Sequence, residues 1–259
     1  MNPLEAFRRS VSQNINALGS DAALHETTLR WIIQSNVHGY TYNHTWLDRP
    51  IIQYPQDMVA VQELIWQIKP DLVIETGIAH GGSLILSASM LALIDYCDAA
   101  AASAVLDPKA GGRRVLGIDI DIRAHNRAAI EAHPLAHKID MIEGSSIDPA
   151  VVARVRACAA KHRTILVLLD SMHTHDHVLA ELEAYAPLTS PGSYCVVFDT
   201  LIEDMPEGMF SDRPWGRGNN PKTAVWEFLK GHPGFEIDKR IESKLLITVA
   251  PDGYLKRLK

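Results

Sequence analysis

The sequence predicts an α/β fold in which a mostly parallel, doubly wound sheet is covered by helices on both faces. Two observations carry this prediction. Short apolar runs alternate with stretches of helical spacing, and successive runs end in an acidic residue. The four acids are Glu75, Asp119, Asp170 and Asp199. Because parallel strands end at one edge of a sheet, where such folds bind ligands, we expect these acids to surround one site.

The chain is long enough, at 259 residues, for one large domain with an extension. Residues 1–56 are expected to form an N-terminal helical extension. Its last part, from residue 31 onward, mixes aromatic and polar side chains and is either a lid over a ligand or a packed surface arm. Residues 57–259 are expected to form the main domain, which starts with a helix capped by Asp57.

A strand, a glycine loop and a helix follow one another in residues 70–92. The apolar run of residues 72–74 ends at Glu75, and the loop carries Gly77, Gly81 and Gly82 before Ser83 starts a helix. Gly77 allows a sharp turn, and the glycine pair lets the backbone come close to a ligand. The dinucleotide and phosphate-loop fingerprints are both absent. An acid before the first glycine suits a positively charged ligand end better than a pyrophosphate.

The next two predicted strands point to a nucleoside. Residues 115–118 end at Asp119, whose carboxylate can accept hydrogen bonds from both ribose hydroxyls, as in NAD enzymes. Asp121 is an alternative for this role. Residues 140–143 form the third strand, and the loop with Ser145 and Ser146 is expected to flank an adenine.

The second half of the chain supplies the other acids. Residues 164–169 are apolar throughout, which predicts a central strand that is buried on both faces and ends at Asp170. Residues 194–198 form the fifth strand, before Asp199. A long polar and aromatic loop over residues 200–220 is expected to be functional. Residues 235–237 and 245–249 are expected to close the sheet as an antiparallel hairpin.

Composition excludes several classes of function. The net charge is −6 and the basic residues are scattered, which argues against nucleic-acid binding. The three cysteines have no C-x-x-C spacing, as expected in a reducing cytoplasm. We expect no signal peptide and no membrane-spanning run, hence a cytoplasmic protein without membrane partners. The sequence is compatible with a homo-oligomer.

From about Trp46 to its C-terminus, the sequence resembles the cephalosporin hydroxylase family. The motifs that carry the resemblance are Pro55-x-Asp57, Glu75-Thr-Gly77-x-x-x-Gly81-Gly82-Ser83, Glu143-Gly144-Ser145-Ser146-x-Asp148-Pro149, Leu169-Asp170-Ser171-x-His173-x-x-x-His177, Pro191-Gly192-Ser193-Tyr194 and Lys244-Leu245-Leu246-x-Thr248. Despite its name, that family is similar to metal-assisted, S-adenosylmethionine (SAM)-dependent O-methyltransferases of class I, with a Rossmann-like fold and an antiparallel last strand. Its members act on antibiotics and sugars. The aromatic and polar loops around residues 40–46 and 213–220 would suit a sugar or glycosylated natural product as substrate, and the same features fit a phenol.

The resemblance also implies roles for individual residues. Glu75, Ser83 and the backbone at Gly77, Gly81 and Gly82 would hold the methionine end of SAM. Asp119 would hold the ribose, Ser145 or Ser146 would lie on the adenine side, and Asp170 would border the cofactor. His173, three residues after Asp170, matches the lysine base of catechol-type methyltransferases by position and is the candidate catalytic base, together with Asp170.

The family's metal pattern is only partly present. Asp170 and Asp199 match two ligands of a Mg²⁺-like ion, but Phe198 occupies the position of the family's glutamate. Glu203, Asp204 or a histidine near residue 173 could replace that ligand, or the site is weak or absent. Two alternative functions therefore stay open. One is a non-haem iron hydroxylase that uses His173, His175 and Asp176. The other is a non-catalytic SAM-binding protein.

Overall fold

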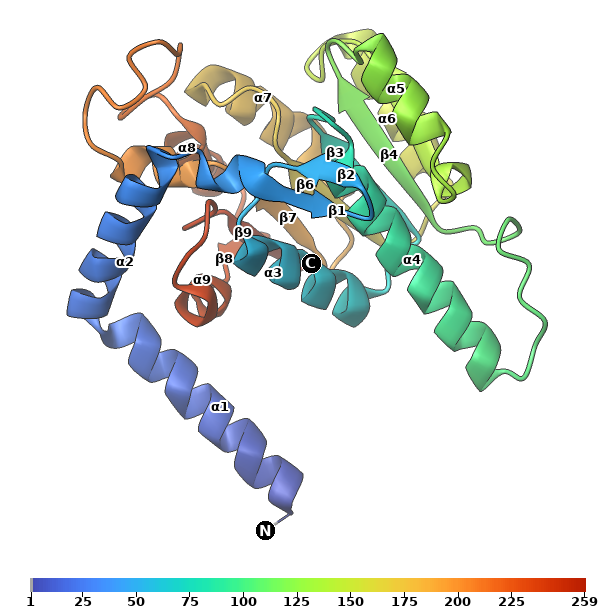
Figure 1. The fold of residues 1–259 in the computed structure, drawn as a ribbon, viewed down its shortest axis with the longest axis horizontal. Coiled ribbons are helices and arrows are strands. Elements are labelled where there is room, and N and C mark those ends of the chain that lie inside the picture. The colour runs from blue at the N-terminus through green and yellow to red at the C-terminus, as the bar shows by residue number, and fades with distance from the viewer. Residues whose placement is uncertain (1) are drawn as a thin grey trace.

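The sheet has seven strands, and the computed structural model describes it within residues 2–259. The strand order is β5-β4-β3-β6-β7-β9-β8, and helices cover both faces (Figure 1). The strands are β3 (Leu72–Thr76), β4 (Arg114–Asp119), β5 (Ile139–Glu143), β6 (Ile165–Leu169), β7 (Tyr194–Val197), β8 (Phe235–Ile237) and β9 (Tyr254–Arg257). The predicted fold class is confirmed, including the doubly wound topology.

Strand order reverses between β3 and β6, and this reversal places the site. Strands β4 and β5 extend the sheet on one side of β3, whereas β6 and β7 extend it on the other, and all five are parallel. Thr76 lies opposite Leu169, so the loops after β3 and β6 leave the sheet side by side. A crevice at such a reversal is the usual ligand site of open α/β sheets.

Side chains of the central strands alternate between two apolar cores. Val73 and Leu166 face the core under α3, α4 and α5, whereas Leu72 and Val167 face the core under α6, α7 and α8. These helices are α3 (Pro55–Ile68), α4 (Gly82–Ala101), α5 (Ala124–Glu131), α6 (Pro149–Ala159), α7 (His175–Tyr185) and α8 (Pro221–Gly231). Burial on both faces explains why β3 and β6 read as continuous apolar runs.

Helix α4 is a single apolar element of 20 residues. By length and composition it reaches the dimensions of a membrane span, contrary to the expectation of no such run. Its Leu84, Ile85 and Leu91 are fully buried in the core shared with β3 and β4. Packing of this helix in the core explains its apolar composition.

The N-terminal region is a helical extension followed by a short hairpin. Helix α1 (Pro3–Ser20) points away from the sheet, and α2 (Ala22–Asn36) leads back to it (Figure 1). We call residues 37–54 the arm; it contains β1 (His44–Trp46) and β2 (Arg49–Ile51), paired antiparallel. Trp46 Nε1 donates to Ser89 Oγ of α4 at 3.0 Å, which fixes the arm over the start of that helix.

The predicted C-terminal hairpin is correct in its first strand and wrong in its second. Residues 235–237 form β8 as expected, but their antiparallel partner is β9, between β7 and β8, and not residues 245–249. Helix α9 (Lys239–Leu245) precedes that segment. Val249 donates its backbone N–H to the buried Asp57 carboxylate at 2.9 Å instead of to a neighbouring strand. Asp57 also accepts a hydrogen bond from Tyr254, so it anchors the closing segment instead of capping its own helix.

Candidate functional site

A large cavity lies where the strands β3, β6 and β7 end. It has a volume of about 510 Å³ and is enclosed by the arm, the glycine loop and the loop after β7. Its lining includes Gly77 and Ser83 of the glycine loop and Phe210, Arg213 and Trp215 of the loop after β7. The long loop of residues 200–220, which includes the short helix Thr200–Asp204, thus borders the cavity as expected.

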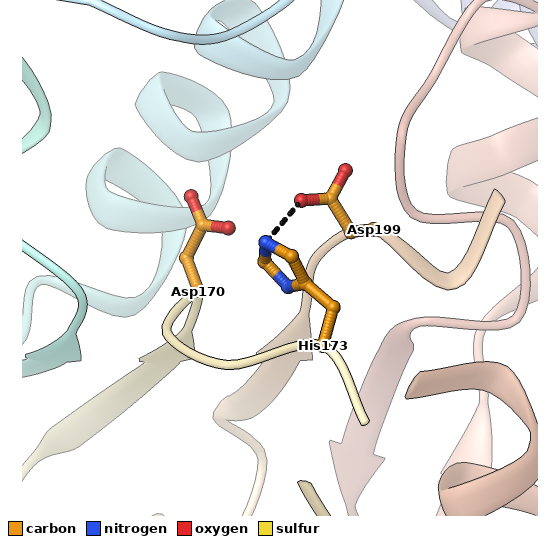
Figure 2. Close-up of side chains that lie close together, drawn as sticks. All are labelled: Asp170, His173 and Asp199. Atoms are coloured by element: carbon orange, nitrogen blue, oxygen red, sulfur yellow. Dashed lines mark ion pairs between the residues drawn. The ribbon is translucent and has the colours of Figure 1, made fainter. Parts of the chain in front are cut away.

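Asp170, His173 and Asp199 meet on the wall of this cavity (Figure 2). One ligand atom of each lies within 4.8 Å of those of the other two. His173 Nε2 is 3.0 Å from Asp199 Oδ2. The backbone of Asp199 is left-handed, with φ at 56°, which turns its carboxylate back towards the β6 loop.

Electrostatics in this cluster favour a positive partner. Burial, with the nearby Asp199 and Glu75 carboxylates, raises the pKa of Asp170 well above its ordinary value. Gln53 of the arm donates from Nε2 to Asp170 Oδ2 at 3.1 Å. A divalent ion or a proton on the imidazole would relieve the repulsion between the two carboxylates.

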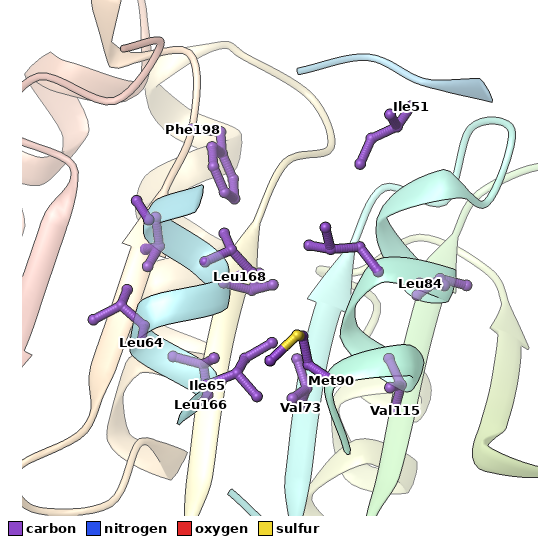
Figure 3. Packing of buried hydrophobic residues seen from close by; sticks show 14 of the residues in the cluster. Ile51, Leu64, Ile65, Val73, Leu84, Met90, Val115, Leu166, Leu168 and Phe198 are labelled. Carbon is purple, nitrogen blue, oxygen red and sulfur yellow. The ribbon is translucent and has the colours of Figure 1, made fainter. Parts of the chain in front are cut away.

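The structure shows which of the candidate replacements for the family's glutamate lies close enough to Asp170 and Asp199 to share a metal ion with them. Phe198 packs in the apolar core beside Leu168 (Figure 3) and offers no ligand atom. Glu203 is bound to the Asn220 side chain and the Gly218 amide, and Asp204 pairs with Lys222. Among the described residues, His173 is therefore the side chain that joins the two aspartates.

The other two histidines after β6 turn away from this cluster. His175 Nδ1 is 2.8 Å from Thr223 Oγ1, and its Nε2 is 3.3 Å from Glu227, both on α8. His177 Nε2 lies 3.1 Å from Ser146 Oγ. The two-histidine facial arrangement that an iron hydroxylase needs is therefore not assembled from these residues.

Glu75 is buried beneath the cavity with one oxygen unpaired. The Ser83 hydroxyl donates to Oε1, whereas Oε2 has no hydrogen-bond partner. Burial raises the pKa of Glu75 to about 8. An ammonium group that donates to Oε2 would satisfy this oxygen, so Glu75 fits the methionine end of SAM.

The glycines allow close contacts within the protein itself. A Cβ at Gly77, where φ is +88°, would lie 1.9 Å from the Asp170 carbonyl oxygen. A Cβ at Gly82 would lie 2.3 Å from the carbonyl oxygen of Pro50 in the arm, and one at Gly81 would meet Ile130. Gly77 thus lets the β3 and β6 loops touch, and Gly82 lets the arm seat on α4.

Asp119 is engaged by the glycine loop. Its Oδ2 accepts from the amides of Ile78 at 2.7 Å and Ala79 at 3.2 Å, and its Oδ1 accepts from Asp121 at 3.1 Å. Asn126 of α5 holds the same loop through the Ala79 carbonyl oxygen. Asp119 does not line the large cavity.

Ser145 and Ser146 also lie outside the large cavity. Ser146 is buried, and its carbonyl oxygen accepts from the Tyr185 hydroxyl. His177 joins it to Ser171, whose hydroxyl donates to the fully buried Glu181 at 2.7 Å. The predicted cofactor residues therefore fall into a cavity group and a separately packed group.

The sequence around Gln53 does not indicate a functional role, because this residue is a single polar side chain between aliphatic and aromatic neighbours. In the structure its side chain is 7% exposed and touches the reactive cluster. In the sequence, Trp215 is one of several aromatic and polar residues of the loop over residues 200–220. Its ring meets the His173 imidazole edge-on, with centroids 4.8 Å apart, and the Arg213 guanidinium lies over the Trp215 ring, 5.5 Å from its centroid.

Comparison with known proteins identifies close relatives. Residues 38–258 match the family model described as Rhamnosyl O-methyltransferase/CmcI. The Rhamnosyl O-methyltransferase of Mycobacterium tuberculosis (strain H37Rv) is 31% identical over 204 residues, covering 78% of this chain and 73% of that protein. The Rhamnosyl O-methyltransferase of Mycobacterium leprae is 28% identical over 218 residues, covering 82% of each.

Two solved structures share the fold. CmcI with Mg-SAM superposes with a TM-score of 0.55 at 16% identity, covering 84% of this chain and 78% of that one. An O-methyltransferase from Bacillus cereus in complex with SAH superposes with a TM-score of 0.52 at 16% identity, covering 90% and 91%.

Proposed function

This chain belongs to the rhamnosyl O-methyltransferase/CmcI family, and we propose that it methylates a hydroxyl group on a sugar or glycosylated natural product with SAM as donor. The resemblance read from the sequence motifs is thereby confirmed at the level of the family and of the reaction class. The relatives from Mycobacterium are named for rhamnosyl groups, so a rhamnosyl or similar deoxysugar is the acceptor we propose first.

One observation carries the proposal. The His173 and Asp199 pair lines a cavity that is also lined by the glycine loop and by the aromatic and basic residues Trp215 and Arg213. A donor held at the glycine loop and an acceptor held at Trp215 and Arg213 would share this cavity with the imidazole. Positioning of this kind supplies a large part of the rate of a two-substrate reaction.

SAM supplies a methyl group on a sulfonium ion, which is transferred in line to the acceptor oxygen. Asp199 Oδ2 lies 3.0 Å from His173 Nε2 and would stabilise the imidazolium, and the other ring nitrogen, Nδ1, would accept the hydroxyl proton. Asp170, held by Gln53, lines the same cavity, and the positive charge of the donor would favour its ionised form. Trp215 and residues of the arm line the cavity around this cluster.

Asp170 and Asp199, with His173 beside them, are the residues that would hold a divalent ion. A bound ion would orient the acceptor hydroxyl and lower its pKa. With Phe198 at the third family position, we propose that this centre binds Mg²⁺ or a similar ion with fewer carboxylate ligands than the family pattern.

The acceptor end of the cavity suits a sugar. Trp215 offers an aromatic surface for a sugar ring, and Arg213 and Asp212 offer a donor and acceptors for hydroxyl groups. Residues 1–56 are proposed as a separate extension whose arm lids the cavity. We propose a cytoplasmic location without membrane or nucleic-acid partners, and we leave open a homo-oligomer.

The test is methyl transfer to a panel of synthetic glycosides. Purified protein is incubated with SAM and Mg²⁺, and each acceptor is followed by mass spectrometry for the gain of one methyl group. The panel pairs an α-rhamnoside with its aglycone and with a glucoside of the same aglycone. Methylation of the rhamnoside alone supports the proposal; methylation of the aglycone would replace the sugar by a phenol or alcohol as acceptor.

A further inference from the structure

A second, small cavity lies beneath the catalytic cluster. It has a volume of about 20 Å³, which accommodates one group of the size of a water molecule. Its polar walls are three carboxyl groups, one amide and two hydroxyls, and its lining contains no basic side chain. The lining residues with polar groups are Gln53, Asp57, Glu75, Ser83, Ser87 and Asp170.

Two oxygens of residues that line this small cavity have no hydrogen-bond partner. Glu75 Oε2 and Gln53 Oε1 are both buried. The Gln53 amide nitrogen donates to Asp170 Oδ2, which leaves the amide oxygen of the same side chain unpaired. Leaving a buried acceptor unpaired is costly.

The small cavity adjoins the large one. Gln53, Ser83 and Asp170 are walls of both cavities. A chain end that enters from the large cavity would thus present its terminal group to Gln53 and Glu75 together. The occupant must be about the size of one water molecule and must donate to the two unpaired oxygens beside carboxyl groups, and an ammonium group meets these requirements.

On the proposed function, we infer that Gln53 of the arm is a cofactor-binding residue whose Oε1 accepts a hydrogen bond from the α-ammonium of SAM. The same amide donates to Asp170. One side chain therefore joins the cofactor to the catalytic carboxylate, and the arm takes part in selecting a ligand with an amino group. This assigns Gln53 a function that the local sequence does not indicate.

The test compares ligands with and without the ammonium group. S-adenosylhomocysteine and decarboxylated SAM carry an amino group, whereas 5′-methylthioadenosine keeps the adenosine and sulfur but lacks the amino-acid end. Each is titrated by calorimetry into wild-type protein and into Gln53→Leu, which preserves volume. Gln67→Leu on the exposed side of α3 is the matched control.

We expect Gln53→Leu to weaken both amino-containing ligands about 10- to 100-fold, as for a lost hydrogen bond to a charged group, and to leave 5′-methylthioadenosine unchanged. Gln67→Leu leaves all three unchanged. Equal weakening of all three ligands would overturn the inference in favour of a structural role. Unchanged binding of all three would also overturn it, with water as the occupant. If wild-type protein binds none of them, the proposed function fails as well.

Discussion

Two halves of the sheet edge differ in how their polar groups are paired. The catalytic half, at the ends of β3, β6 and β7, contains Glu75 and Gln53 with unpaired buried oxygens. In the nucleoside half, at the ends of β4 and β5, Asp119 accepts three backbone hydrogen bonds and Ser146 lies in a side-chain network. Glu75 and Gln53 thus have oxygens available to a ligand, whereas Asp119 is already held by the protein; in the network of Ser146, one buried oxygen of Glu181 is also unpaired.

Because of this difference, we expect the two halves to recognise different parts of a ligand: its positive charge in one half and its adenosine in the other. Unpaired buried acceptors reduce the stability of the ligand-free protein, and a cationic ligand removes that cost when it binds. Paired groups hold the glycine loop in place whether or not a ligand is present. We therefore expect variants in the catalytic half to change the affinity only for ligands that carry the positive charge. Variants in the nucleoside half should change the affinity for every adenosine ligand by the same factor.

The largest expected effect is on catalysis at His173. His173→Ala removes the proton acceptor and should lower kcat by about 10²- to 10⁴-fold, while the Kd of S-adenosylhomocysteine changes little. His175→Ala is the matched control, since that imidazole contacts α8 instead of the cavity. Single-turnover rates and calorimetry check both. A similar loss in the two variants would contradict the role of His173.

The metal centre should show the next largest effect. Asp199→Asn removes one carboxylate and should weaken Mn²⁺ binding by about 100-fold, measured by electron paramagnetic resonance of the free ion. Asp204→Asn is the control, because that carboxylate pairs with Lys222 outside the cluster. Equal Mn²⁺ binding in wild type and Asp199→Asn would place the ion elsewhere.

Asp119 tests the nucleoside half. Asp119→Asn weakens two loop hydrogen bonds and removes the charge that would face the ribose. It should reduce the affinity for S-adenosylhomocysteine and 5′-methylthioadenosine by the same factor, about 10-fold. Asp121→Asn, at an exposed neighbour, should change neither. A selective loss of one ligand would remove the distinction between the two halves.

The smallest effect is a pH dependence of stability from Glu75. Its folded pKa of about 8 lies above its ordinary value of 4.5, so the folded state keeps a proton that the unfolded state releases. Stability should therefore fall as pH rises from about 4.5 to about 8. Glu75→Gln removes this contribution and should reduce the fall in Tm between pH 6 and pH 7 by about 3–5 °C. Glu26→Gln, on exposed α2, serves as the control; an equal fall in wild type and Glu75→Gln would mean that Glu75 is ionised throughout.

Local sequence patterns determined most of the architecture. The runs that end at Glu75, Asp119, Asp170 and Asp199 were assigned to strands because burial on both faces of a parallel sheet requires continuous apolar stretches. The order of strands and helices then fixed which edge holds the acids. The family motifs gave the reaction class, since several of them occur in the same order.

Only the tertiary structure decided what lies opposite these residues. The apolar run that ends at Val249 has the pattern of a strand. In the structure, however, the Val249 amide donates to Asp57, 192 positions earlier, and the Val249 carbonyl oxygen accepts from the Leu201 amide. Gln53 reaches Asp170 across 117 positions. Contacts over such separations leave no periodicity in the chain, because they depend on how the arm and the closing segment pack on the sheet. The sequence thus specified the acids of the site, and long-range packing selected their partners.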